Sequence, residues 1–128
     1  MSSVLRVSGV SFDVDSFLAA SRLKPCKVWH VGEQIRPSRP PSDTAGFNVG
    51  VGDAGTRDIT SSIGDAIRFL GENRAELSRL ATLADMTLDF GVANREIPAQ
   101  YCRFPSELIR LAAEFRMEIE VSIYMCEP

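Results

Sequence analysis

Hydrophobic and polar residues alternate in five stretches of this chain, which is the pattern of strands that turn one face to a core. The stretches are residues 4–9, 26–31, 46–51, 86–92 and 118–124. The last is the cleanest, because Ile119, Val121 and Ile123 share one face and alternate with Glu118, Glu120, Ser122 and Tyr124. Each stretch therefore predicts a strand with one apolar and one polar side.

Apolar residues recur at helical spacing between these strands. A short helix is predicted to begin at Asp13, whose side chain suits the N-cap, and to end near Ser21. The longest helical stretch covers residues 58–70, and a second piece follows a break at 71–73. Asn73 and Glu76 resemble a capping box at the start of that second piece. A last helix is predicted from Pro105 to residue 115.

The order of these elements predicts an α+β fold with helices on one face of a mostly antiparallel sheet. The first six elements match the ferredoxin-like, split βαβ plan, and a C-terminal helix and strand are added to it. A length of 128 residues favours one domain over residues 1–128. The proline-rich stretch 35–46 is interpreted as a surface loop within that domain.

Two local details are also predicted. Trp29 and Val31 form the core-facing pair of their strand, so that His30 points elsewhere. Residues 101–104 are predicted to form a short strand. If this strand lies at the edge of the sheet, Tyr101 and Cys102 would give it an apolar surface suited to dimerisation.

Composition and charge narrow the class of protein. The chain is 45% hydrophobic and carries a net charge of −3, which is typical of a globular protein and gives no electrostatic reason to expect a nucleic-acid or anionic-membrane partner. No apolar run approaches the roughly 18 residues of a membrane span, and the N-terminus lacks a signal-peptide pattern. Cys26, Cys102 and Cys126 form no CxxC pair, which favours free thiols in the cytoplasm. We expect neither a metal nor a cofactor.

Several short motifs together resemble one protein family. They are Leu5-Arg6-Val7-Ser8-Gly9, Phe12-Asp13-Val14-Asp15, Leu23-Lys24-Pro25 and Trp29-His30-Val31-Gly32-Glu33, with a final helix and strand ending Ile123-Tyr124. In this order they resemble the bacterial "domain of unknown function 4279" family across nearly the whole chain. Here Gly46-Phe47 stands where that family usually has Gly-Trp. The resemblance implies a small intracellular α+β domain and supplies no catalytic residues.

The polar faces of the strands carry the first candidate site. If the central strands adjoin, one open surface would combine Arg6, Ser8, Thr87, Asp89, Glu118, Glu120 and Ser122. Such a surface is either a solvated face or a recognition surface for a protein or small ligand. The binding candidates are Arg6, Asp89, Glu118, Glu120, Trp29 and His30.

Residues 50–55 match the pattern GxGxxG, in which Gly50, Gly52 and Gly55 would let the backbone approach a phosphate. The predicted helix begins several residues later than in a dinucleotide site, which favours a plain strand-to-helix loop.

His30, the sole histidine, is a weak catalytic candidate if a carboxylate such as Glu33, Asp89 or Glu120 orients it. Asp13 and Asp15 are acidic neighbours that N-capping and the helix dipole explain without a metal.

Three functions from different classes fit these observations. The first is a non-catalytic protein-interaction module, similar by analogy alone to immunity proteins that neutralise toxins. The second is a small-ligand sensor that uses the 50–55 loop or the helix start at Asp13. The third is a hydrolase-type enzyme that uses His30 with a carboxylate. A protein partner or a second copy of the chain is the expected binding partner.

Overall fold

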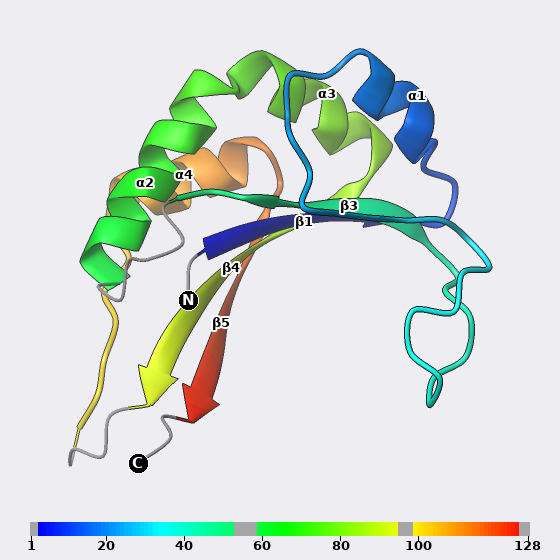
Figure 1. The fold of residues 1–128 in the computed structure, drawn as a ribbon. Coiled ribbons are helices and arrows are strands. Elements are labelled where there is room, and N and C mark those ends of the chain that lie inside the picture. Colours follow the sequence, from blue (N-terminus) through cyan, green and yellow to red (C-terminus); the bar gives the residue numbers. More distant parts are fainter. Residues whose placement is uncertain (1–2, 53–58, 95–98, 126–128) are drawn as a thin grey trace.

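The structure, a computed structural model, describes residues 3–52, 59–94 and 99–125 (Figure 1). Its strands and helices follow one another as β1 (Ser3–Gly9), α1 (Val14–Ala19), β2 (Lys27–Trp29), β3 (Ala45–Gly50), α2 (Ile59–Glu72), α3 (Arg74–Leu83), β4 (Asp85–Asn94), α4 (Ser106–Glu114) and β5 (Glu118–Met125).

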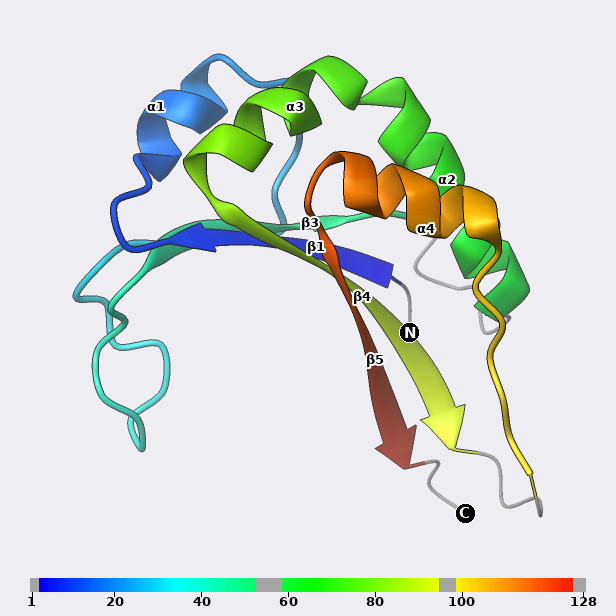
Figure 2. The same cartoon turned by 180° about the vertical axis from the view of Figure 1, so that it is seen from behind.

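The strands form one five-stranded sheet in the order β2-β3-β1-β4-β5. Every neighbouring pair is antiparallel except β4 and β5, which are parallel and joined through α4. Helices α1, α2, α3 and α4 all lie on one face of the sheet (Figures 1 and 2). The predicted α+β class, the mostly antiparallel sheet and the added C-terminal helix and strand are confirmed.

A hydrophobic core fills the layer between the sheet and the helices. Leu5, Phe47 and Leu88 point into it from the three central strands and are fully buried. Leu77 of α3 and Leu108 of α4 are fully buried against them. The alternating pattern therefore identified the covered face of β1, β3 and β4 correctly.

The helix ends differ in part from the predicted caps. The Asp13 cap is confirmed, because its carboxylate accepts a hydrogen bond of 3.1 Å from the backbone N–H of Ser16. The capping box at Asn73 is wrong. The Asn73 amide donates instead to the carbonyl of Phe69 at the end of α2, and Glu76 accepts from the backbone N–H of Arg22. These side chains connect α3 to neighbouring segments and do not cap the N-terminus of α3.

Strand β2 is shorter than the predicted stretch 26–31, and the prediction that Trp29 and Val31 form its core pair is wrong. The register places Val28 opposite Phe47 and Trp29 opposite Gly46, so Trp29 lies on the sheet face away from the helices. Val31 falls beyond the strand and is 57% exposed. In a three-residue edge strand, the register with the neighbouring strand determines which side chains face the core. The alternation within β2 alone did not indicate this register.

The predicted strand at residues 101–104 is also wrong, because the chain there is irregular. It packs through a side chain: the ring centroids of Phe104 and Phe90 lie 5.4 Å apart. The edge of the sheet on this side is β5.

The second half of β5 runs on past the helices (Figures 1 and 2). Val121 and Ile123 share the helix side of the sheet with Phe90 and Val92, yet they are 39% and 69% exposed. A nine-residue helix such as α4 spans about 13.5 Å, whereas an eight-residue strand spans about 26 Å. Helix α4 is therefore too short to cover the whole strand.

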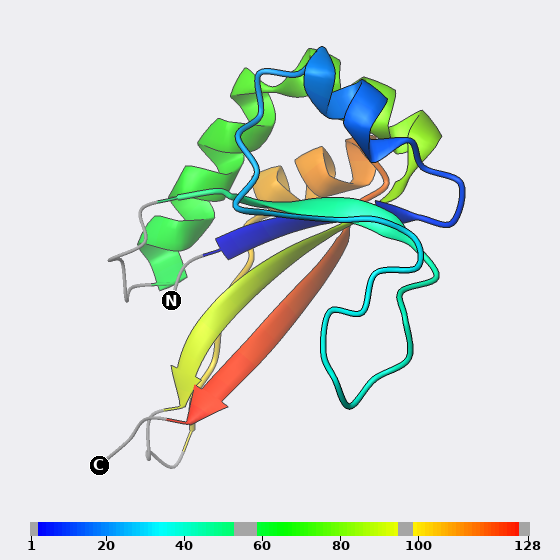
Figure 3. The same ribbon diagram turned by 45° about the vertical axis from the view of Figure 1, so that its right-hand side comes forward.

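Residues 30–44 form a loop that hangs at one end of the sheet, on the side away from the helices (Figure 3). Two backbone hydrogen bonds close it, from Gly32 N–H to Ser42 (2.7 Å) and from Ser42 N–H to Glu33 (2.8 Å). Every residue from 31 to 41 is exposed. The loop therefore borders the uncovered face without adding to the core.

Candidate functional site

Figure 3 shows that the helices leave the opposite face of the sheet uncovered, and this face is called the open face below. The register places the outward side chains of β1, β4 and β5 on it. Because β1 lies beside β4 and β4 beside β5, Arg6 is opposite Thr87, and Asp89 is opposite Glu120. The structure thus brings together residues that are far apart in the chain, namely Arg6, Thr87, Asp89, Glu118, Glu120 and Ser122. The grouping predicted from alternation follows from this strand order.

Four of these side chains form one polar cluster. The Arg6 guanidinium donates to Asp89 at 3.2 Å and also to Glu120, and the Ser122 hydroxyl donates to both oxygens of Asp89 at 2.8 and 3.0 Å. The Asp89 side chain is only 13% exposed, so these partners replace the water that it loses. The Asp89 carboxylate therefore joins β1, β4 and β5 on this face, because its hydrogen bonds come from Arg6 of β1 and Ser122 of β5.

The open face is acidic along β4 and β5. Asp85, which lies opposite Ser8 on this face, together with Asp89, Glu118 and Glu120 contributes four negative charges against the one positive charge of Arg6, which leaves −3 on this side. Glu120 and Arg6 are half exposed, at 51% and 40% of their side chains. Rearranging these two residues costs little, because exposed ion pairs contribute little to stability.

Trp29 occupies the other side of the open face. Its indole lies over Gly46, where an added Cβ would come within 2.8 Å of the ring. The indole N–H donates to the Thr44 hydroxyl at 3.3 Å. A large, half-buried aromatic ring is therefore held at the opposite end of this face from the acidic strands.

His30 is clamped between two carboxylates at the base of the loop. Nδ1 lies 2.7 Å from Glu33, and Nε2 lies 3.0 Å from both oxygens of Asp15 in α1. The hydrogen bonds to Asp15 and then to Glu33 raise the pKa of His30 above its usual value. Of the carboxylates predicted to orient His30, Glu33 does so, whereas Asp89 and Glu120 pair with Arg6. Asp15 is the partner that the sequence pattern missed, because nothing in the spacing links α1 to the loop.

The glycine-rich stretch is described as far as Gly52, and Gly55 lies outside the described residues. Gly50 is exposed and has open space around it. At Gly52 an added Cβ would lie 2.8 Å from the Cβ of Asp65, which pairs with Arg68 at 3.2 Å. A carboxylate beside Gly52 opposes the binding of a phosphate there.

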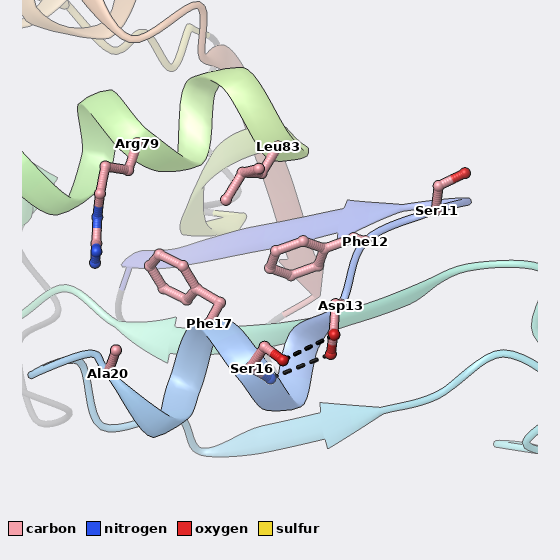
Figure 4. A pocket seen from close by; sticks show the side chains of 8 residues that line it. All are labelled: Ser11, Phe12, Asp13, Ser16, Phe17, Ala20, Arg79 and Leu83. Carbon is pink, nitrogen blue, oxygen red and sulfur yellow. Dashed lines mark hydrogen bonds between the residues drawn. The ribbon is translucent and has the colours of Figure 1, made fainter.

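A further hollow, which the sequence pattern did not predict, lies between α1 and α3 and measures about 360 Å³ (Figure 4). Its walls are mostly apolar, and Arg79 and Asp13 are its charged residues. No sequence pattern could indicate this hollow, because its lining residues come from two helices about 60 residues apart. The Asp13 carboxylate is held by Ser16, whose hydroxyl and backbone N–H lower the pKa of Asp13.

Residues 3–52, 59–94 and 99–125 contain neither a metal site nor a membrane-spanning helix. No group of three or more histidine, cysteine or acidic side chains there is arranged to hold a metal ion. No helix in the same ranges is long and apolar enough to cross a bilayer.

These observations define a class: an α+β protein whose helices cover one face of a five-stranded sheet and leave a polar face open. The chain belongs to the family described as "Domain of unknown function (DUF4279)", whose pattern matches residues 1–126. The family resemblance seen in the sequence is confirmed. Comparison with curated proteins and with solved structures returned no match.

Proposed function

We propose that this protein is a non-catalytic interaction module that binds another protein on its open face. The observation that carries the proposal is the cluster of Arg6, Asp89 and Glu120 on a sheet face that the four helices leave uncovered. Arginine and tryptophan are enriched in protein interfaces, and the open face holds Arg6 and Trp29.

The charge of the face indicates the chemistry of the partner. With a balance of −3 along β4 and β5, the open face complements a basic protein surface. Trp29 at the other end supplies an aromatic contact, so a partner that spans the face would place basic groups over Asp89 and Glu120 and an apolar group on the indole. The analogy with immunity proteins fits such a partner.

We also propose that the first six predicted elements follow the ferredoxin-like plan. The order β2-β3-β1-β4 with antiparallel pairing supports this, with α2 and α3 together in the place of the second helix. The bacterial cytoplasm is the proposed location, which the free thiols of Cys26 and Cys102 support.

The enzyme alternative draws least support from the site geometry. Both ring nitrogens of His30 already contact carboxylates, so neither is open to take a proton from a substrate. The ligand-sensor alternative draws support from the hollow between α1 and α3.

The experiment compares capture by three forms of the chain in a lysate of the bacterium that encodes it. Glu120→Arg reverses a half-exposed charge on the open face, and Glu107→Arg makes the same change on the exposed side of α4. We expect the wild type and Glu107→Arg to retain the same protein, and Glu120→Arg to retain about tenfold less or none.

Circular dichroism checks that both variants are folded. A purified partner then serves for titration, in which raised salt should slow association. Equal retention by Glu120→Arg and Glu107→Arg, or no retained protein with any form, would contradict the proposal.

A further inference from the structure

The hollow between α1 and α3 has an apolar floor (Figure 4). Phe12 and Phe17 form it, and their rings are 6.1 Å apart. Leu83, at the end of α3, borders the hollow and remains 54% exposed. A ligand with an apolar body that covers Leu83 and the two rings would remove that surface from water, which favours binding.

Arg79 supplies a cation at one side of this floor. Its guanidinium carbon lies over the ring of Phe17, 5.4 Å from the centroid, which is within the range of a cation–π contact. The N–H groups at the edge of the plane stay available for a bidentate contact. Within the described ranges no carboxylate pairs with Arg79, unlike Arg6, Arg68 and Arg74.

Asp13 limits the charge that the hollow can accept. Figure 4 shows its carboxylate and the Arg79 guanidinium at opposite ends of the row formed by Phe17 and Phe12. The Asp13 carboxylate already accepts from the backbone N–H and hydroxyl of Ser16. A ligand that carries one anion at the Arg79 end fits this arrangement, whereas a second anion at the far end would be repelled.

We propose that this hollow binds a small monocarboxylate with an apolar chain or ring, its carboxylate on Arg79 and its apolar body over Phe12, Phe17 and Leu83. The volume of about 360 Å³ lies within the range of roughly 300–1,000 Å³ of small-molecule sites. The site is separate from the open face, since it lies among the helices on the opposite side of the sheet (Figure 1).

Three probes with eight carbons separate the contribution of the carboxylate to binding from that of the apolar chain. They are octanoate, 1-octanol, which lacks the charge, and suberate, which carries a second carboxylate at the far end. Binding is followed by two-dimensional NMR of the ¹⁵N-labelled chain. We expect octanoate to shift the amide signals of residues around Phe17 and Leu83 in a saturable way, and octanol and suberate to bind about tenfold more weakly or not at all.

Two variants and one control locate the carboxylate. Arg79→Gln removes the cation, and Leu83→Asp places a negative charge on an exposed position of the hollow, where it should repel the ligand without unfolding the chain. Arg110→Gln makes the same change as Arg79→Gln on the exposed side of α4. We expect octanoate to bind Arg110→Gln as it binds the wild type, and to bind the other two about tenfold more weakly.

Octanol binding as tightly as octanoate would overturn the proposal, as would equal effects of Arg79→Gln and Arg110→Gln, or no saturable shift with octanoate. Glu120→Arg on the open face should leave octanoate binding unchanged, so this result is independent of the proposed function.

Discussion

Strands β4 and β5 share one alternating pattern and lie in register, yet only one of them is covered. Phe90 is fully buried and Val92 is 9% exposed, whereas their partners Val121 and Ile123 are 39% and 69% exposed. Alternation therefore identifies only the side of a strand that faces the core layer. Whether that side is covered depends on the segments that lie above it: the Phe104 ring packs on Phe90 of β4, whereas helix α4 is too short to cover the whole of β5.

The largest expected effect on stability comes from comparing truncations of one side chain in β4 and its partner in β5. Phe90→Ala should lower the free energy of unfolding by about 3–5 kcal/mol, because it leaves a cavity in the core beside the Phe104 ring. Val121→Ala, its register partner, should cost about 1 kcal/mol, since much of the side chain is already in water. Urea unfolding followed by circular dichroism measures both. Equal costs would mean that something covers β5 in solution.

Two glycines of β3 offer a second contrast between a crowded and an open position. At Gly46 a Cβ would collide with the Val7 carbonyl oxygen and lie 2.8 Å from Trp29, so Gly46→Ala should destabilise the protein by about 1–3 kcal/mol. Gly50→Ala, four residues along the strand, meets no atom within 4 Å and should be neutral or stabilise by up to about 1 kcal/mol. Thermal unfolding of the two variants separates them. A stable Gly46→Ala protein would contradict the packing of the indole.

A smaller effect is expected at the turn from α4 into β5. Arg116 has a φ of 58°, and the N–H of Met117 donates to Ala112 while that of Arg116 donates to Ala113, which is a Schellman ending with arginine at the glycine position. Arg116→Gly should raise the free energy of unfolding by about 0.5–1 kcal/mol by relieving this conformation. Arg116→Ala is the control and should bring no gain, because alanine keeps the Cβ.

The smallest effect is the pH dependence at His30, at the loop end of the molecule. Its pKa is raised in the folded state by Asp15 and Glu33, so the folded state binds the proton more tightly than the unfolded one. The resulting stabilisation is fully present below the ordinary pKa of about 6.5 and is lost as pH rises through the folded value. His30→Gln should reduce the difference in Tm between pH 5.5 and pH 8.

NMR titration of the sole histidine in the wild type should give a pKa above its ordinary value. A titration at or below 6.5 would show that the clamp does not form.

The fold followed from the sequence wherever side chains alternate over several residues. Leu5, Phe47 and Leu88 lie on the predicted faces because a long strand beside two neighbours has one consistent side toward the core. Trp29 was misplaced because three residues are too few to carry that signal. The cluster of Arg6, Asp89 and Glu120 required the strand order as well as the alternation.

The hollow at Phe17 and Arg79 and the contact between His30 and Asp15 could not be read from the chain. Both join elements through tertiary packing, and neither leaves a regular spacing between the residues involved.

The position of Trp29 has a practical consequence. It is the single tryptophan of the chain, it lies half-buried on the open face, and its indole N–H is held by Thr44. Its intrinsic fluorescence therefore arises from one known place, and a protein that docks there should shift the emission to shorter wavelength by excluding water from the ring. Occupancy of that surface can thus be followed in the unlabelled native chain.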